Sequence, residues 1–471
     1  MRKFFITNAI PYVNAKPHIG HALEFVQSDV IARYHKILGE DVCLLCGGDE
    51  NALKNVQAAE KAGKPIQEFI DENTQSFYNL AKNLNIQFDV WQKASDNLHH
   101  KSSQELWKLC EKAGDIYKKS YKGLYCVGCE AFYAKEELDE NGECFEHPGK
   151  KLETVEEENY FFRLSNYTEK IKSLINSGQL TITPQFRKNE ILSFLEEGLK
   201  DISISRNNER AKNWGVPVPN DPKQRMYVWF DALNIYQSGI GFGWDEKKYK
   251  KWWPANLHVI GKGIIRFHAV YWPAFLLSAG LETPKSLFVH EYFTVNGQKM
   301  SKTLGNVIDP MEMVAKYGTD ALRYYFLAKF SPFSDGDFSE EKLKEVYNSD
   351  LANGLGNLIS RVAKMCEKNN VTIAKKTDQL FREVTTALDE FRFNEALTFI
   401  WGKISEIDRA INETKPWELF NEKAKKVLVE YAEKIEEISY NIQPFLPSTA
   451  EKIQKQLTGN IKAGEPLFPR L

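Results

Sequence analysis

Short apolar runs alternate with longer amphipathic stretches over the first 115 residues. Residues 4–6 and 42–46 are apolar runs of strand length, and the apolar spacing between residues 18 and 38 predicts a helix. Because strand, helix and strand follow in this order, the pattern predicts a parallel α/β sheet.

This strand pattern stops and later returns. Residues 116–225 are rich in Lys, Glu, Tyr and turn-forming residues, so we interpret them as an insertion between two halves of the sheet domain. Further strands are expected at 227–230, 257–260 and 287–289. The dipeptide Asn296-Gly297, which follows another short run, predicts a hairpin with a type I′ turn.

After about residue 340 the apolar pattern is helical throughout. Apolar residues recur at helical spacing from Leu397 to Ile411 and again from Val427 to Ile438. The segment 447–451 (PSTAE) has the pattern of a capping box that opens a further helix. We therefore predict an α/β domain in two halves, 1–115 and 226–340, an insertion at 116–225, and an all-α bundle at 341–471.

Charge and hydropathy narrow the possible locations and partners. The 471 residues carry 62 basic and 64 acidic side chains, so any RNA contact depends on a local surface and not on net charge. The apolar run at the N-terminus is too short for a signal peptide, and the apolar stretch 269–281 is shorter than the roughly 20 residues of a membrane helix. We expect a cytoplasmic protein with no membrane or DNA partner.

A first candidate phosphate motif follows the first predicted strand. In Pro17-His18-Ile19-Gly20-His21 the two histidines are three residues apart, at the start of the predicted helix, where free N–H groups and the helix dipole attract phosphate. Gly20 leaves room for a flat ring against the backbone. Two imidazoles there could stabilise the charge that builds up when a carboxylate attacks an α-phosphate. Alone, the motif also fits two surface histidines or a nucleotidylyltransferase.

A second candidate motif, Lys299-Met300-Ser301-Lys302-Thr303, follows the predicted hairpin turn. Its two lysines could hold the β- and γ-phosphates and follow the charge onto a pyrophosphate leaving group. Alone, such a run is most often a solvated basic loop. The two motifs together, some 280 residues apart, resemble the signature of class I aminoacyl-tRNA synthetases.

The cysteine spacing predicts a metal. Cys126, Cys129, Cys144 and His147 form two pairs with two-residue gaps, which suits tetrahedral zinc. Three thiolates and one imidazole leave no open position, so we predict structural Zn²⁺. Its binding free energy, about 10–16 kcal/mol in comparable zinc peptides, would help to fold the insertion. Cys43 and Cys46 lie in an apolar strand pattern and are predicted core residues.

Taken together, the motifs and the helical C-terminus resemble methionyl-tRNA synthetases with a single zinc knuckle. The most specific stretches are residues 9–12, 227–232, 261–274 (GKGIIRFHAVYWPA) and 291–303 (EYFTVNGQKMSKT). The resemblance implies a Rossmann-like catalytic domain with a zinc-knuckle insertion, followed by an anticodon-binding helix bundle. It also implies that ATP, with Mg²⁺, activates L-methionine for transfer to tRNA(Met).

The resemblance also implies site residues. His18, His21, Lys299 and Lys302 would be catalytic, and Gly20 and Ser301 would complete the ATP site. Asp49 would bind the methionine ammonium group. The anticodon would be read by Asn357, Arg361 and Trp417. The remaining methionine pocket would consist of Ile10, Tyr12, Trp229, Ala232, Leu233, Tyr236, Ile264 and His268.

Some positions depart from the family pattern. Asn51-Ala52 stands where His-Gly is common, Gly263 where Asp is common, and Thr303 where Ser is usual. The first two are near the expected substrate site and could change affinity or specificity. The chain ends after the predicted bundle, so we expect a monomer.

Other functions remain open at this point. Synthetases for leucine, isoleucine and valine usually need a larger editing insertion than residues 116–225 provide, and a cysteine enzyme would need its zinc beside the substrate thiol. A non-catalytic, zinc-containing tRNA-binding protein would explain the cysteines and Trp417 but not two intact phosphate motifs.

Overall fold

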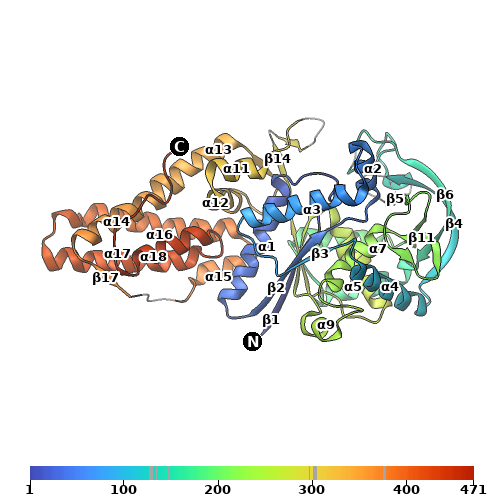
Figure 1. Ribbon diagram of the computed structural model, residues 1–471. Helices are drawn as coiled ribbons and strands as arrows, with labels where there is room; N and C mark the ends of the chain where they lie inside the picture. Colours follow the sequence, from blue (N-terminus) through green and yellow to red (C-terminus); the bar gives the residue numbers. More distant parts are fainter. Residues whose placement is uncertain (127–130, 134, 147, 296, 301–304, 375–377) are drawn as a thin grey trace. The chain divides into compact units, whose positions relative to one another are not determined.

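Figure 1 shows the computed structural model of the chain. The structure describes residues 1–126, 131–133, 135–146, 148–295, 297–300, 305–374 and 378–471. The chain forms two compact units, each assembled from several segments. The first unit contains residues 1–17, 39–79 and 87–290, and the second contains residues 18–38, 80–86 and 291–471.

The first unit is built on a six-stranded sheet with the order β3-β2-β1-β12-β13-β7, in which every neighbouring pair is parallel. These strands are β1 (Lys3–Asn8), β2 (Asp41–Gly48), β3 (Val90–Lys93), β7 (Thr181–Thr183), β12 (Leu257–Gly261) and β13 (Ser286–His290). Strands β1 and β12 are almost fully buried, which explains the apolar runs within them, such as residues 4–6 of β1. The predicted parallel α/β fold is confirmed.

The strand order creates a switch point. Strands β2 and β3 lie on one side of β1, whereas β12 and β13 lie on the other side. In doubly wound sheets a ligand binds at the carboxyl ends of the strands where the order reverses, here β1 and β12. Residues after Asn8 and after Gly261 therefore border the expected ligand crevice.

Two smaller antiparallel sheets, ordered β5-β4-β6-β8 and β10-β11-β9, contain the other described strands of the first unit. Their bounds are β4 (Ile116–Cys126), β5 (Ala131–Tyr133), β6 (Glu153–Phe162), β8 (Ile202–Ser203), β9 (Ser205–Asn207), β10 (Pro217–Val218) and β11 (Asp221–Met226). The helices of this unit are α2 (Leu53–Ala62), α3 (Ile66–Asn83, whose last turn belongs to the second unit), α4 (Asn97–Lys112), α5 (Thr168–Asn176), α6 (Gln185–Glu196), α7 (Val228–Leu233), α8 (Ile235–Ser238), α9 (Glu246–Trp252) and α10 (Trp272–Ser278).

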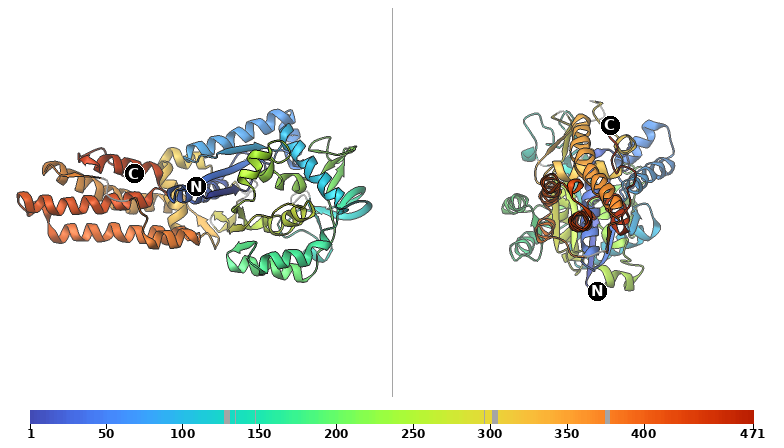
Figure 2. Two further views of the ribbon diagram at one scale, coloured as in Figure 1. Left: turned by 90° about the horizontal axis from the view of Figure 1, so that it is seen from below. Right: turned by 90° about the vertical axis from the view of Figure 1, so that its left-hand side faces the viewer.

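The second unit is mainly helical. It contains α1 (Ile19–Ile37), α11 (Pro310–Tyr317), α12 (Thr319–Lys329), α13 (Glu340–Val346), α14 (Asn357–Lys368), α15 (Arg382–Asp389), α16 (Phe393–Thr414), α17 (Asn421–Ile442) and α18 (Pro447–Leu457). Its strands are β14 (Phe293–Val295), β15 (Gln298–Lys299), β16 (Gly336–Phe338), β17 (Thr372–Ile373) and β18 (Gly459–Asn460). Helices α14, α16, α17 and α18 pack as a bundle, seen as the long orange and red helices of Figure 2.

The bundle buries the predicted apolar stripes. Ile400, Ile404 and Ile407 of α16 are buried, as are Leu428 and Ile435 of α17. The C-terminal helical prediction is therefore confirmed, with the two-residue pair β17–β18 as a minor addition.

Two local predictions were wrong. Residues 228–233 form helix α7 and not a strand, because a fully buried run of this length shows no periodicity that distinguishes the two. Helix α18 has no capping box. Its N-cap is Leu446, whose side chain makes no cap bond, and the Thr449 N–H is instead accepted by Asp320 of α12 at 2.6 Å.

None of the helices in the described part of the chain is both long enough and apolar enough to span a bilayer.

Candidate active site

The two motif histidines cap helix α1 together. Nδ1 of His18, the N-cap residue, accepts the Gly20 N–H at 3.1 Å, and Nδ1 of His21 accepts the His18 N–H at 3.1 Å. Their rings lie 3.9 Å apart between centroids. Because each Nδ1 accepts, each neutral ring carries its proton on Nε2, the atom that can donate to a phosphate oxygen.

His21 is held in the neutral form. Burial lowers the pKa of His21 well below its ordinary value, and the neighbouring His18 lowers it further. A neutral imidazole remains a hydrogen-bond donor at pH 7 and does not pair as a cation with the substrate in the ground state. The first motif can therefore stabilise charge that develops later on a phosphate.

The flanks of the second motif lie against the start of α1. A Cβ added to Gly20 would stand 3.0 Å from Cε1 of His18 and 3.5 Å from Cε of Met300. The absence of a side chain at Gly20 therefore leaves room for both of these side chains. The Ile19 N–H donates to the Ile308 carbonyl at 3.1 Å. The second unit thus brings the two motifs together at Met300, whereas Ser301, Lys302 and Thr303 lie outside the described residues.

The hairpin before the second motif is confirmed. Strands β14 and β15 pair antiparallel, with Thr294 opposite Lys299, and Gly297 has φ +71° in the turn. Asp337 of β16 accepts both the Thr294 hydroxyl and the Gly297 N–H at 2.8 Å. These hydrogen bonds lower the pKa of Asp337, the Gly297 N–H most strongly, so its carboxylate fixes the turn at neutral pH.

An aromatic cluster in the first unit contains most of the predicted methionine pocket. Trp229 of α7 stacks on Phe267 at 3.8 Å between centroids and meets the rings of Tyr12 and His268 edge-on, both at 6.3 Å. Ala232, Leu233 and Tyr236 follow on α7 and α8 and are buried, whereas Ile10, Tyr12 and Ile264 are half-buried against the same core. The cluster combines residues that follow β1, residues that follow β12, and residues of helices α7 and α8.

The two polar side chains of this cluster, Tyr236 and His268, form a hydrogen bond with each other. Nδ1 of His268 is 3.0 Å from the Ile264 carbonyl, so Nδ1 carries the proton and Nε2 accepts the Tyr236 hydroxyl at 2.8 Å. Burial lowers the pKa of His268 to about 4, against a smaller raising effect of the Ile264 carbonyl. The pair is therefore neutral at pH 7, with its donors used internally.

Asp49 lies directly after β2, beside Tyr12. The backbones of Tyr12 and Asp49 form an isolated parallel bridge, and the Asp49 side chain is only 3% exposed. Asn55 donates to the Asp49 carbonyl at 2.8 Å, and the Lys54 ammonium lies 3.0 Å above the centre of the Tyr12 ring. The buried Asp49 thus stands beside Tyr12 in the backbone, and a carboxylate there could pair with the ammonium group of a ligand.

Comparison with known proteins decides the family. Residues 4–363 match the family described as tRNA synthetases class I (M). The methionine–tRNA ligase of Thermotoga maritima is 43% identical over 97% of this chain and 75% of its own length. That of Nostoc sp. is 41% identical over 98% of this chain and 91% of its own.

The chain belongs to the class I methionyl-tRNA synthetase family. The solved structure of the Mycobacterium tuberculosis methionyl-tRNA synthetase in complex with methionyl-adenylate superposes with a TM-score of 0.93. The two sequences are 36% identical, and the match covers 100% of both chains.

The three residues predicted to read the anticodon lie on the helix bundle or next to it. Here Asn357 begins α14 and is exposed, and Arg361 follows one turn later. Arg361 forms an ion pair with Asp408 at 2.6 Å and donates to the Asn412 side chain at 2.9 Å, both residues of α16. Trp417 lies after α16 with 53% of its surface exposed. An exposed indole of this kind can stack on an RNA base.

A cavity of about 350 Å³ adjoins Arg361, and both of its partners, Asp408 and Asn412, line it. The guanidinium group is thus fixed at the edge of a surface hollow. A fixed planar group is suited to recognise the edge of a nucleobase.

The predicted zinc knuckle is described only in part. Cys126 and Cys144 are buried, and their sulfur atoms lie 3.2 Å apart without forming a disulfide. Cys129 and His147 lie outside the described residues. Within the described residues no group of three or more candidate ligands is gathered. The two buried thiols are close enough to share one metal ion, which fits the predicted chemistry.

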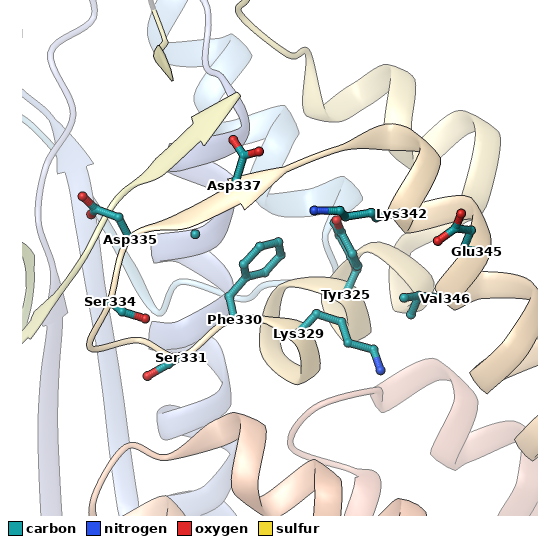
Figure 3. A pocket seen from close by; sticks show the side chains of 11 residues that line it. Tyr325, Lys329, Phe330, Ser331, Ser334, Asp335, Asp337, Lys342, Glu345 and Val346 are labelled. Atoms are coloured by element: carbon teal, nitrogen blue, oxygen red, sulfur yellow. The ribbon is translucent and has the colours of Figure 1, made fainter. Parts of the chain in front are cut away.

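A second hollow, of about 500 Å³, lies next to the hairpin of the second motif (Figure 3). Its wall combines α12, β16 and α13, with charged side chains of both signs, among them Lys329, Asp337 and Lys342. Phe330 packs so closely on Gly336 that an added Cβ there would stand 2.4 Å from the ring. Asp337 lines this hollow and also accepts the Gly297 N–H, so the hollow adjoins the hairpin turn.

Sequence reasoning missed three residues of the aromatic cluster. Phe267 is the stacking partner of Trp229, Lys54 covers Tyr12, and the buried His258 of β12 lies 4.5 Å from Tyr236 between ring centroids. Phe267 is adjacent to His268 in sequence, which is a usable signal. The positions of Lys54 and His258 depend on the packing of segments that are distant in sequence.

Proposed function

We propose that the chain is a methionine–tRNA ligase. It activates L-methionine with ATP, releases pyrophosphate, and transfers the methionyl group to the 3′ end of tRNA(Met). The observation that carries this proposal is the pair of histidines that cap α1, with Met300 of the second motif against them, in a member of this family.

In the activation step the methionine carboxylate attacks the α-phosphorus of ATP, bound as its magnesium complex. A new carboxyl O–P bond forms, and the bond to the β-phosphate breaks, with its electron pair leaving on pyrophosphate. Nε2–H of His18 and His21 stabilises the charge on the α-phosphate in the transition state. We assign Lys299 and Lys302 to the β- and γ-phosphates, where charge accumulates as pyrophosphate leaves.

The proposed methionine pocket would select its substrate through an aromatic wall in which the polar Tyr236–His268 pair is already hydrogen-bonded. The Tyr236 hydroxyl is used by His268, and His268 is neutral, so the wall offers a thioether apolar rings and a polarisable edge. A branched side chain would collide with the stacked Trp229 and Phe267 rings, which have little room to move. Asp49 would bind the ammonium group.

In the transfer step a terminal ribose hydroxyl of the tRNA attacks the methionyl-adenylate carbonyl and displaces AMP. We infer that Trp417, Arg361 and Asn357 recognise the anticodon, with the indole stacking on one base and the polar side chains reading base edges. Such an interface would leave amino-acid activation independent of the anticodon residues.

We further propose one structural Zn²⁺ held by Cys126, Cys129, Cys144 and His147. When bound, such an ion would join the segments that carry its ligands and so stabilise this part of the chain. The closeness of the Cys126 and Cys144 sulfur atoms supports this assignment. The cytoplasmic location and the monomeric state stay predictions from the sequence.

A charging assay tests the proposal. The purified chain, ATP and labelled methionine are incubated with a tRNA(Met) transcript and with a transcript in which the CAU anticodon is changed. The proposal predicts label on the CAU transcript and a large loss of charging on the changed one. Binding of the transcript without charging would favour the non-catalytic RNA-binding alternative.

A further inference from the structure

Asn51 connects three segments of the first unit. It lies three residues after β2, and its side chain is buried. The side-chain amide donates to Oδ2 of Asp231 at 2.7 Å and to the carbonyl of Ala94 at 2.9 Å. Ala94 directly follows β3, and Asp231 lies in α7, so both amide hydrogens reach across to other elements.

Helix α7 is short and buried, and the hydrogen bond from Asn51 adds to the core packing that positions it. It has only six residues, its N-cap Tyr227 makes no side-chain cap bond, and yet it carries Trp229 and Ala232 of the proposed methionine pocket. Asp231 is 1% exposed, so its hydrogen bond with Asn51 links a polar amide to a buried carboxylate, a strong class of hydrogen bond.

The loop that carries Asn51 also carries Asp49. Asn55 donates to the Asp49 carbonyl and the Trp214 indole donates to the Glu50 carbonyl, both at 2.8 Å. The loop backbone is therefore held on two sides. The Asn51 side chain adds a direct hydrogen bond from this loop to α7.

We propose that Asn51 is a positioning residue for methionine. Its bond to Asp231 fixes the separation between the Asp49 carboxylate, which would hold the ammonium group, and the α7 wall, which would hold the side chain. An amino acid must reach both at once, so this separation sets the affinity for methionine. The inference rests on the proposed function of the same pocket and adds a residue to it.

Steady-state pyrophosphate exchange tests it, with methionine and ATP varied separately. The variants are N51A, which removes both donors, N51D, which places a carboxylate against Asp231, and N51H, which restores one donor. The matched control is N207A. It removes the same type of bond, from an Asn amide to the Glu157 carboxylate at 2.9 Å, in the antiparallel part of the unit.

The expected result is a rise in the KM for methionine of about 10- to 100-fold in N51A. The rise should be larger in N51D and smaller in N51H, while the KM for ATP changes by less than about twofold. N207A should match the unsubstituted chain. This split between the two KM values, with rescue by N51H, is not expected if Asn51 only stabilises the fold.

Three outcomes would overturn the inference: an unchanged KM for methionine in N51A, a parallel rise in both KM values, or a loss of kcat alone. If N51A does not fold, the N51D and N51H variants decide, and equal KM values for methionine in these two would refute it. No methionine-dependent exchange by the unsubstituted chain would instead overturn the proposed function, and this inference with it.

Discussion

The hydrogen bond between Tyr236 and His268 gives the sharpest prediction about the proposed methionine pocket. Tyr236→Phe removes the hydroxyl that donates to Nε2 of His268 at 2.8 Å, and His268 is only 1% exposed. In the empty pocket of the variant a water molecule can take the place of the hydroxyl. The methionine side chain displaces that water on binding and leaves a buried acceptor without a donor.

Leaving a buried acceptor unsatisfied costs about 1–3 kcal/mol. Since about 1.4 kcal/mol is a factor of ten, kcat/KM for methionine should fall by about 5- to 150-fold, while the KM for ATP stays the same. The assay is methionine-dependent pyrophosphate exchange, combined with urea unfolding to measure the free energy of unfolding. Tyr117→Phe is the control, because it removes an equivalent tyrosine bond, to Asp201 at 2.8 Å, away from the aromatic cluster.

Two results would refute the reasoning. If Tyr236→Phe kept the kcat/KM of the unsubstituted chain, the hydroxyl would not shape the pocket. If Tyr117→Phe lost as much as Tyr236→Phe, the effect would come from general destabilisation and not from the acceptor left on His268.

Three further predictions concern the phosphate motif, the pH dependence and the bundle. His21→Asn should slow activation by about 10²–10³, measured as pyrophosphate exchange, because it loses one donor to the α-phosphate. His268 binds a proton only below about pH 4 in the folded chain, whereas an unfolded histidine does so below about pH 6.5. The unfolded state therefore gains a proton first as the pH falls, so the free energy of unfolding is highest above pH 6.5 and decreases as the pH falls towards 4. At pH 5 the free energy of unfolding, measured in urea, should be about 2 kcal/mol lower for this reason, and the His268→Phe variant should not show this part of the decrease. Trp417→Ala should spare exchange and reduce tRNA charging, because the exposed indole would contact only RNA.

Each of these has a contrary result. An unchanged exchange rate in the His21 variant would remove that residue from catalysis. A pH dependence of unfolding that is the same with and without His268 would show that this side chain is not held neutral by burial. Equal losses of exchange and charging in the Trp417 variant would make that residue structural.

The sequence was sufficient where one physical signal dominates. Strands β1, β2 and β12 are apolar runs because parallel strands are buried on both faces, and they were predicted correctly. The same signal failed at α7, where a continuous buried run of helix has the same apolar composition as a strand. The capping box at 447–451 failed because Asp320, distant in sequence, satisfies the Thr449 N–H.

The sequence supplied a list of candidate site residues, but their geometry could not be predicted from it. The spacing of His18 and His21 indicated a shared face, but the mutual capping of their Nδ1 atoms depends on the backbone at the start of α1. Similarly, the direction of the Tyr236–His268 bond follows from the Ile264 carbonyl, and the ammonium of Lys54 over Tyr12 follows from how α2 packs. These details require coordinates because they join segments that no local pattern relates.

The most direct test of the central claim is pyrophosphate exchange into ATP, without tRNA, in the presence of methionine, leucine, isoleucine, valine or cysteine. The proposed pocket and phosphate motifs predict exchange with methionine and little with the other four. Exchange driven by another amino acid would contradict the assigned pocket, and the absence of exchange with all five would contradict the ligase activity itself.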